Sequence, residues 1–131
     1  MPAAKTLQVS CVQLHWAKPL ERNLERTRHY IRLAASEGSR VVLFPEANLT
    51  SYDFPYVLGL TSEAVQRALD ETRRAAAAAG IWVIVGTLKP TANRLLNLAH
   101  VISPTGDIVH EYAKIHLAGQ DEKQSCRGGD K

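Results

Sequence analysis

Residues 43–55 read LFPEANLTSYDFP, a short apolar run that ends at a proline and is followed at once by a carboxylate. Residues 41–44 (VVLF) have the composition of a buried β-strand. Pro45 has no backbone N–H to give to a sheet, so we expect it at the end of that strand. Glu46 then lies just outside the carboxyl end of the strand, where open α/β sheets place their chemistry. A solvated surface carboxylate is the alternative that this spacing leaves open.

A strand and a helix are predicted before this segment. Residues 7–14 (LQVSCVQL) alternate between apolar and polar side chains, which is typical of a strand. Residues 20–35 carry apolar side chains at helical spacing, and Gly38 is suited to end that helix.

A loop and a second helix are predicted after it. Residues 45–60 are rich in Pro, Asn, Ser, Tyr and Gly, which predicts a loop. Ser62 is the expected N-cap of the next helix, which runs through the alanines at 75–79 and ends at Gly80. Alanine is the best helix former, so this run predicts structure and not a disordered segment.

Three more strands are predicted in the last third of the chain. Residues 81–87 (IWVIVGT) are apolar on both faces, which predicts a central strand. Residues 95–103 and 108–113 flank a turn signal at 104–107 and predict a hairpin. The order predicts an α/β fold whose sheet is parallel at first and antiparallel afterwards. Two helices cover one face of such a sheet, so the other face needs another layer or another chain.

The length, the net charge and the apolar stretches of the chain limit the classes of protein to which it can belong. A length of 131 residues fits one domain, residues 1–131. The net charge of +3 arises from 16 basic and 13 acidic residues that are interspersed, so no nucleic-acid partner is indicated. No stretch is long and apolar enough for a membrane span, and the first ten residues lack the apolar core of a signal peptide. We therefore expect a cytoplasmic protein.

The two cysteines predict neither a disulfide framework nor a metal site. Cys11 lies in an apolar strand, where we expect a small buried side chain. Cys126 and His116 do not have zinc-ligand spacing and are not accompanied by further ligands.

Two further residues are candidates for chemistry together with Glu46. Lys114 follows the fifth strand, and Glu122 comes eight residues later. A lysine beside a glutamate stabilises the carboxylate and offers a fixed positive charge to an oxyanion. The alternatives are a solvated lysine at a strand end and, for Glu122, a solvated acid in the polar segment GQDEKQS.

The loop residues after Glu46 have two possible roles. Tyr52 and Phe54 either line a substrate pocket or cover an edge of the core. Asn48, Thr50 and Ser51 are better explained as turn residues than as ligands for a substrate.

Three stretches carry a resemblance to a known family. VSCVQLHWAKPLERNLERTRHYIRLAASEGSRVVLFPEANLTSYDF is similar to the opening strand, helix and second strand of the nitrilase superfamily, ending in its Phe-Pro-Glu motif. GIWVIVGT and NLAHVISPTGDIVHEYAKIHL resemble the strands that lead to the family's lysine motif, and GGDK resembles the turn after it. Nearly the whole chain resembles the amino-terminal half of these carbon–nitrogen hydrolases.

The resemblance implies a fold and a chemistry. The family fold is a four-layer α-β-β-α sandwich, of which this chain would form the amino-terminal part, with a mixed sheet and about two main helices. Glu46 matches the general base, Lys114 the lysine that stabilises the tetrahedral intermediate, and Glu122 a second, positioning glutamate. A cysteine attacks a small amide, carbamoyl compound or nitrile, with no cofactor and no metal. The resemblance also implies a homo-oligomer.

The sequence departs from the family at the nucleophile. The family's cysteine lies one strand further on, and neither Cys11 nor Cys126 matches its motif. We therefore expect a truncated domain that lacks the cysteine and is inactive alone. A catalytically dead binding or assembly module is the alternative, and Cys126 as a substitute nucleophile is a third. A half sandwich would expose an apolar sheet face, so we also expect self-association or a need for the missing half.

Overall fold

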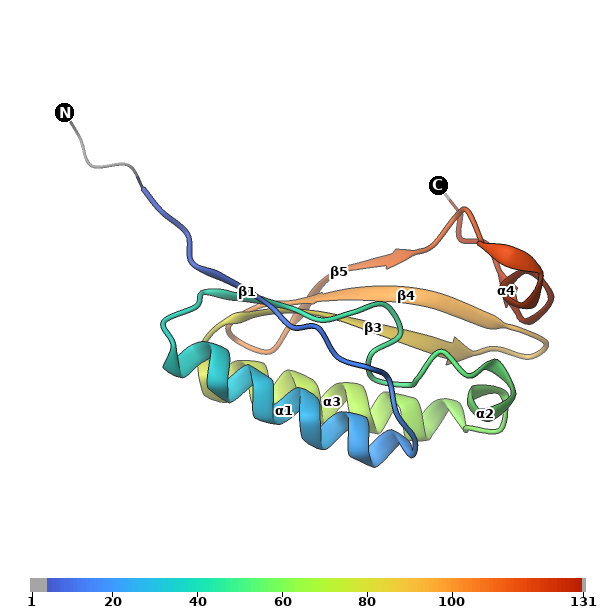
Figure 1. The fold of residues 1–131 in the computed structure, drawn as a ribbon, viewed down its shortest axis with the longest axis horizontal. Coiled ribbons are helices and arrows are strands. Elements are labelled where there is room, and N and C mark those ends of the chain that lie inside the picture. The colour runs from blue at the N-terminus through green and yellow to red at the C-terminus, as the bar shows by residue number, and fades with distance from the viewer. Residues whose placement is uncertain (1–4, 131) are drawn as a thin grey trace.

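Six strands form one mixed sheet, and two long helices cover one of its faces (Figure 1). The computed structural model describes residues 5–130. The elements in chain order are β1 (Val9–Cys11), α1 (Leu20–Ser36), β2 (Val41–Leu43), α2 (Phe54–Leu58), α3 (Ser62–Ala79), β3 (Trp82–Pro90), β4 (Leu95–Ile102), β5 (Ile108–Ala113), α4 (Gly119–Ser125) and β6 (Cys126–Arg127). Residues 1–4 and 131 lie outside the described part. They include Lys131 of the GGDK motif and the start of the segment in which no signal peptide is predicted.

The sheet has the predicted change of direction. The strand order is β1-β2-β3-β4-β5, and β6 pairs with the start of β4. The pairs β1–β2 and β2–β3 are parallel, because α1 and α3 carry the chain back over one face between them. The pairs β3–β4 and β4–β5 are antiparallel, as expected of the hairpin around residues 104–107. The prediction that residues 81–87 form a central strand is confirmed, since β3 lies in the middle of the order.

Glycines end the two long helices as expected, but one helix begins with a different cap. Gly38 follows α1 with φ +84°, and Gly80 ends α3 with φ +66°, a backbone conformation that glycine adopts without strain. The prediction that Ser62 caps α3 is wrong. Thr61 is the N-cap, because its side-chain oxygen accepts a hydrogen bond from the backbone N–H of Ala64 at 3.1 Å. The Ser62 hydroxyl instead donates to the carbonyl of Pro90.

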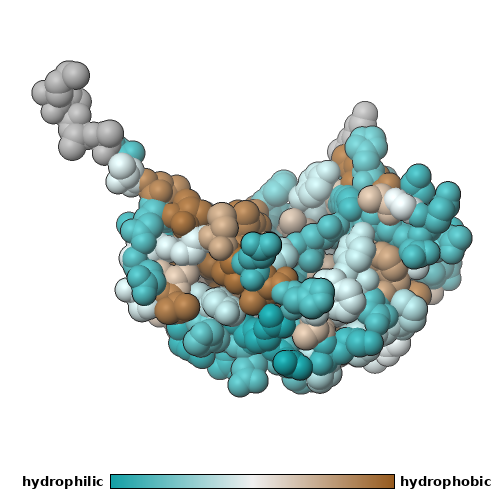
Figure 2. All heavy atoms as spheres, in the orientation of Figure 1, coloured by the Kyte–Doolittle hydropathy of each residue, from teal (hydrophilic) through white to brown (hydrophobic). Residues whose placement is uncertain are grey.

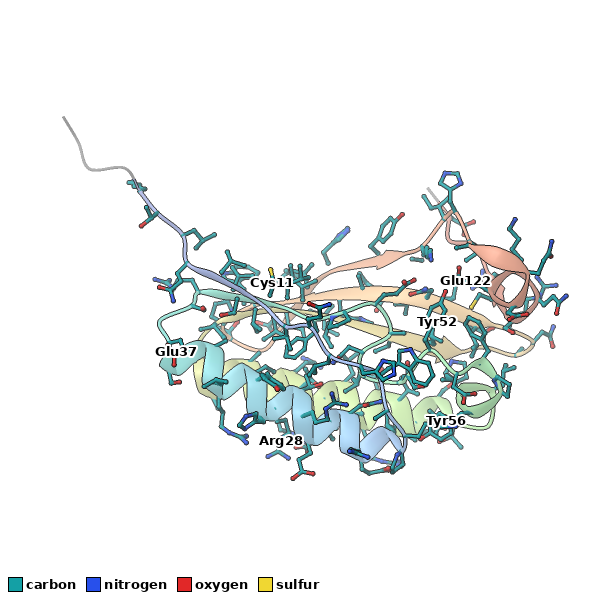
Figure 3. All side chains as sticks on the ribbon, viewed as in Figure 1. Cys11, Arg28, Glu37, Tyr52, Tyr56 and Glu122 are labelled. Carbon is teal, nitrogen blue, oxygen red and sulfur yellow. The ribbon has the colours of Figure 1, made fainter. Side chains whose placement is uncertain are left out.

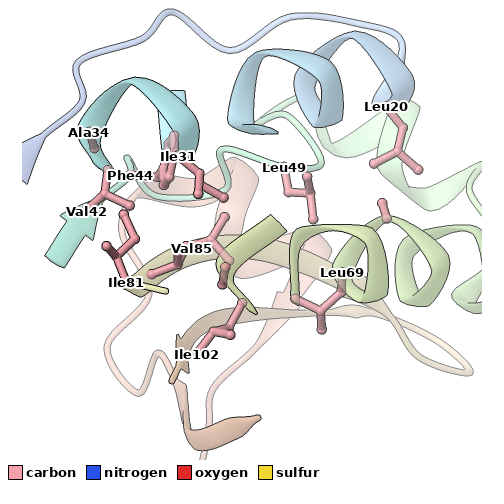
Figure 4. Close-up of a cluster of buried hydrophobic side chains, with 13 residues drawn as sticks. Leu20, Ile31, Ala34, Val42, Phe44, Leu49, Leu69, Ile81, Val85 and Ile102 are labelled. Carbon is pink, nitrogen blue, oxygen red and sulfur yellow. The ribbon is translucent and has the colours of Figure 1, made fainter. Parts of the chain in front are cut away.

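The main core lies between the helices and the sheet. Figure 4 shows Ile31 of α1, Leu69 of α3 and Val85 of β3 among the side chains that fill this layer. Ile31 and Val85 are completely buried. Burial of such side chains contributes about 1.5–3 kcal/mol each, which explains why α1 and α3 are fixed to this face.

Neither long helix packs on the opposite face of the sheet, and α4 covers only the end of it where Glu122 bonds to Asn97. Val9, Leu43, Trp82 and Tyr112 are 47%, 40%, 37% and 49% exposed. The parallel register aligns Cys11 with Leu43, so the Cys11 side chain lies on this face as well. Figure 2 shows hydrophobic residues gathered along the side of the molecule away from the helices. The expectation that Cys11 is buried is therefore wrong: the side chain is exposed because none of the described helices packs over β1 on this face.

Two segments that were expected to be irregular contain short helices. Within the predicted loop at 45–60, α2 begins because the carboxylate of Asp53 accepts a hydrogen bond from the backbone N–H of Tyr56 and Pro55 occupies the first turn. The polar segment GQDEKQS forms α4, and β6 follows it directly. The strand predicted over residues 7–14 is reduced to β1, an edge strand paired on one side only. No helix between residues 5 and 130 is long and apolar enough to cross a membrane.

Candidate active site

The candidate residues meet at one edge of the sheet. Glu46 follows β2 and Lys114 follows β5. These two strands run in the same direction, because two antiparallel steps separate β3 from β5. Their carboxyl ends therefore lie at the same edge, and α4 brings Glu122 to it. The structure thus brings together all three residues that were predicted to be catalytic.

Close contact between two backbone segments holds Glu46. The segment after β2 packs directly on Gly86 of β3, where an added Cβ would lie 2.5 Å from the backbone nitrogen of Ala47 and 3.0 Å from the carbonyl oxygen of Pro45. The backbone N–H of Leu49 then donates to the carbonyl of Gly86 at 3.0 Å. Only glycine leaves room for this approach, so Gly86 sets the position of the glutamate backbone.

Lys114 joins the two carboxylates. Its Nζ lies 2.9 Å from Oε1 of Glu46 and 3.1 Å from each carboxylate oxygen of Glu122. Burial by itself would lower the pKa of Lys114, but the hydrogen bonds and negative charges of both glutamates raise it above its ordinary value. The side chain is therefore a permanent cation, suited to stabilising negative charge and not to accepting a proton.

Asn97 is a fourth member of the cluster. Its side-chain amide nitrogen on β4 donates to Oε1 of Glu46 at 2.6 Å and to Oε1 of Glu122 at 3.0 Å. The side chain is 4% exposed. No role was predicted for Asn97 from the sequence, although a polar residue inside the apolar run LLNLAHVI can indicate a functional position. His100 gives the same signal in that run, but it lies under the helices and its Nε2 bonds to Thr87 at 2.8 Å.

The two glutamates have different surroundings. The Glu122 side chain is 1% exposed, whereas that of Glu46 is 50% exposed. Burial by itself would raise the pKa of Glu122, but the backbone N–H of Ala118, the Asn97 amide and the Lys114 cation lower it below its ordinary value. Glu122 is thus a buried, ionised anchor for Lys114. The expectation of a solvated acid in a polar loop does not describe this residue, because α4 folds its side chain inward.

The two aromatic candidates lie beneath α4 and around α2. Figure 3 shows Tyr52 and Glu122 at the same end of the sheet. The pKa of Tyr52 is raised to about 12, first by burial and then by the charges of Glu122 and Glu46. Phe54 is 8% exposed, belongs to a second core cluster and contacts the Tyr52 ring at a centroid distance of 4.8 Å. Tyr52 therefore lies within the electrostatic influence of both glutamates, whereas Phe54 is part of the core.

A hollow of about 190 Å³ lies beside Glu46 and Lys114 on the sheet face away from α1 and α3. Its apolar lining includes Leu43, Ile84 and Tyr112, and neither Tyr52 nor Phe54 contributes to its wall. The cluster of charges therefore borders a hollow on the side of the sheet away from α1 and α3.

The turn residues after Glu46 have structural partners. Asn48 donates to Oγ1 of Thr27 at 2.8 Å, and Oγ1 of Thr50 accepts from the backbone N–H of Leu88 at 2.8 Å. The Ser51 hydroxyl accepts from the backbone N–H of Asp53 at 3.1 Å. Ser51 thus bonds within the loop, as expected of a turn residue, whereas Asn48 and Thr50 tie the loop to α1 and to β3.

Neither cysteine is arranged as a nucleophile. Cys126 is completely buried, and burial together with the charge of Glu122 raises the pKa of its thiol to about 11. Cys11 is exposed on β1, at the far edge of the sheet from β5. Between residues 5 and 130, no group of three or more His, Cys, Asp or Glu side chains is placed to hold a metal ion.

The sequence profile of the carbon-nitrogen hydrolase family matches residues 8–131. The chain therefore belongs to the carbon-nitrogen hydrolase family. It is 29% identical over 115 residues to the omega-amidase NIT2 of Danio rerio, a match that covers 84% of this chain and 40% of that protein. A cyanide hydratase of Penicillium rubens is 28% identical over 110 residues, which cover 73% of this chain and 31% of that protein. The chain thus spans less than half the length of these relatives.

Solved structures show the same fold. A double mutant of the amidase from Nesterenkonia sp. AN1 in complex with acrylamide superposes with a TM-score of 0.89 at 22% identity, covering 100% of this chain and 51% of that one. A further mutant of this nitrilase-superfamily amidase superposes with a TM-score of 0.88 at 22% identity, covering 95% and 49%. The mixed sheet and its two covering helices are therefore part of a nitrilase fold, as the sequence analysis expected.

Proposed function

We propose that this chain forms part of an enzyme that hydrolyses a carbon–nitrogen bond of a small amide, N-carbamoyl compound or nitrile, with Glu46, Lys114 and Glu122 in the catalytic site. The observation that carries the proposal is the joint contact of Lys114 Nζ with both glutamates at 2.9–3.1 Å. The names of the relatives support the reaction type, since they include omega-amidases and a cyanide hydratase.

The difference in exposure between the two acids supports different roles for them. Glu46 is half-exposed and is placed to exchange protons with a reacting group, so it is the general base. Glu122 is buried and holds Lys114, so it is a positioning residue. Lys114 directs its fixed positive charge to the oxyanion that forms when the substrate is attacked.

For an amide, the proposed reaction has two halves. Glu46 takes the proton of a cysteine thiol as the sulfur bonds to the carbonyl carbon, and the carbonyl oxygen becomes an anion near Lys114. The C–N bond then breaks, Glu46 returns the proton to the leaving nitrogen, and a thioester remains. In the second half Glu46 takes a proton from water as the water oxygen bonds to the thioester carbon. The C–S bond then breaks and Glu46 returns the proton to the sulfur, which releases the acid and restores the thiol.

We propose that the attacking cysteine lies in sequence outside these 131 residues. The buried Cys126 thiol and the remote Cys11 support this assignment. One solved mutant of the Nesterenkonia amidase carries the acetamide moiety of fluoroacetamide at its active site cysteine, and this chain aligns with only 51% of that protein. The 131-residue chain is then inactive alone. Homo-oligomeric assembly and a cytoplasmic location stay predictions.

Ammonia release from a panel of amides, nitriles and carbamoyl compounds tests the proposal, with protein made from the complete gene. Glu46→Gln should lower kcat/KM by about 10²- to 10⁴-fold, and Lys114→Ala by about 10²- to 10³-fold. Glu37→Gln and Lys5→Ala, which change exposed residues on α1's carboxyl end and before β1, serve as controls. Turnover that survives both site changes would overturn the assigned roles.

A binding or assembly module is the second candidate, because neither described cysteine is placed to react. This alternative predicts no ammonia release from the complete protein with any compound in the panel. It also predicts that Glu46→Gln leaves partner binding unchanged.

A further inference from the structure

We propose that Asn97 is a positioning residue that holds Glu46 and Glu122 on Lys114 and leaves one oxygen of Glu46 free for proton transfer. The inference rests on the proposed function and adds a residue to it. Among residues 5–130, Asn97 has the only neutral side chain that donates hydrogen bonds to both glutamates.

Asn97 contacts all three charged residues of the site. The two hydrogens of its amide point to Oε1 of Glu46 at 2.6 Å and to Oε1 of Glu122 at 3.0 Å. Its backbone carbonyl accepts a hydrogen bond from the backbone N–H of Lys114 at 2.8 Å. A single residue thus sets the place of both carboxylates and of the lysine between them.

The backbone of Asn97 is itself well fixed. It lies in β4, between β3 and β5, and pairs with Leu88 of β3. The side chain is 4% exposed, so water does not compete for its amide hydrogens. Positioning groups on a central strand hold a site more precisely than groups on a loop.

A primary amide suits the chemistry of the site. Two carboxylates share one ammonium group, and a buried neutral donor adds hydrogen bonds to both carboxylates without the desolvation cost of a further charge. A primary amide has two N–H donors and meets this need, whereas an aspartate would place a third negative charge beside the first two. The reversed amide would direct its oxygen at the carboxylates and is excluded by repulsion.

The pattern of bonds on Glu46 links this geometry to catalysis. Asn97 and Lys114 both bond to Oε1 of Glu46. Within the described part of the chain, Oε2 of Glu46 accepts no hydrogen bond, and the side chain is 50% exposed. Asn97 therefore turns the carboxylate so that Oε2 is the oxygen that takes the proton of the nucleophile.

The test compares Asn97→Leu, Asn97→Asp and Asn97→Ser in protein made from the complete gene. We expect kcat to fall about 10- to 100-fold in Asn97→Leu and Asn97→Asp, with KM changed less than about threefold. The acidic limb of the kcat/KM profile should move to higher pH, because the Asn97 amide is one of the donors that lower the pKa of Glu122. Asn97→Ser keeps one donor and should fall between these variants and the unchanged protein.

His100→Gln is the matched control, since His100 is a buried polar residue of the same strand on the opposite face. His100→Gln should change the thermal stability of the protein without moving the acidic limb of its kcat/KM profile. Unchanged kcat and pH profile in Asn97→Leu, with Glu46→Gln inactive, would overturn the inference while leaving the proposed function intact. Loss of folding in all three Asn97 variants would make the residue structural and would also overturn it. Absence of turnover in the unchanged protein would instead reject the proposed function.

Discussion

The backbone nitrogen of Ala47 lies 2.5 Å from the point where a Cβ on Gly86 would be. This contact seats the turn after β2 on the middle strand of the sheet and places Glu46 opposite Lys114. Replacement of the glycine must move one of the two segments, because the neighbouring atoms are backbone and cannot rotate away.

We expect Gly86→Ala to lower the free energy of unfolding by about 1–3 kcal/mol and to displace Glu46 from Lys114. Urea unfolding of the variant measures the loss of stability. Ammonia release by the complete protein measures the effect of the displaced Glu46 on activity. Gly59→Ala is the control, since φ at Gly59 is −83° and suits any residue; its stability should change by less than about 1 kcal/mol. A fully stable and active Gly86→Ala protein would contradict the contact.

The buried position of Glu122 predicts a pH dependence of stability. Its pKa is lower in the folded than in the unfolded chain, where the ordinary value is 4.5. The unfolded state therefore binds more protons as the pH falls through this value, and the free energy of unfolding falls with it. At pH 7, Glu122→Gln should lower the free energy of unfolding by about 1–3 kcal/mol.

The difference between the unchanged chain and Glu122→Gln should be full above pH 4.5 and shrink below it. Denaturant unfolding between pH 3 and 7, about the range in which carboxylates titrate, measures the difference. Asp121→Asn changes the exposed neighbouring acid. The free energy of unfolding of this variant should depend on pH almost as that of the unchanged chain does. A constant difference at all pH values would show that the charge of Glu122 does not stabilise the fold.

The two thiols should react at different rates. Cys11 is exposed, whereas Cys126 is completely buried and its pKa is raised to about 11. We expect iodoacetamide near neutral pH to label Cys11 in the folded 131-residue chain and to leave Cys126 unmodified, since the thiolate is the reactive form. Peptide mass mapping identifies the labelled site, and denatured chain serves as the control. Fast labelling of Cys126 that slows in Glu46→Gln would instead support Cys126 as the nucleophile.

The sheet face that α1 and α3 leave uncovered should drive association of the isolated chain. It presents Val9, Leu43 and Trp82, which are 37–47% exposed. Val9 and Trp82 both pair with Val41 of β2, and Leu43 lies two residues further along that strand on the same face. Sedimentation of the 131-residue chain should show species heavier than the 14.4 kDa monomer. Leu43→Ser together with Val9→Ser should reduce them, whereas Leu33→Ser on the exposed side of α1 should not. A monomer at all concentrations would contradict this prediction.

Local patterns predicted most of the fold. The apolar run at 81–87 became the middle strand, and the turn signal at 104–107 became the hairpin between β4 and β5. The periodicity of residues 20–35 became α1. Such signals depend on near neighbours in the chain, so they can be read without knowledge of the partners. The short helix α4 has no apolar stripe, and its polar composition concealed it.

Alternation in residues 7–14 identified a strand but assigned Cys11 to the wrong environment. Alternating side chains predict two faces, yet they do not determine which face is covered. In the structure α1 and α3 pack on the face that carries Ser10, and the face that carries Cys11 is left exposed. The covering layer is a property of the whole chain.

The candidate site was likewise predicted only in part from the sequence. The sequence by itself determined where Glu46 and Lys114 stand, since each follows a strand whose end is marked by composition. Tertiary structure alone decided that these residues, 68 positions apart, meet at 2.9 Å, that Glu122 is buried, and that Asn97 bonds to both carboxylates. The physical reason is range: strands and helices follow from the period of neighbouring side chains, whereas burial and charge pairing arise from segments brought together when the sheet forms.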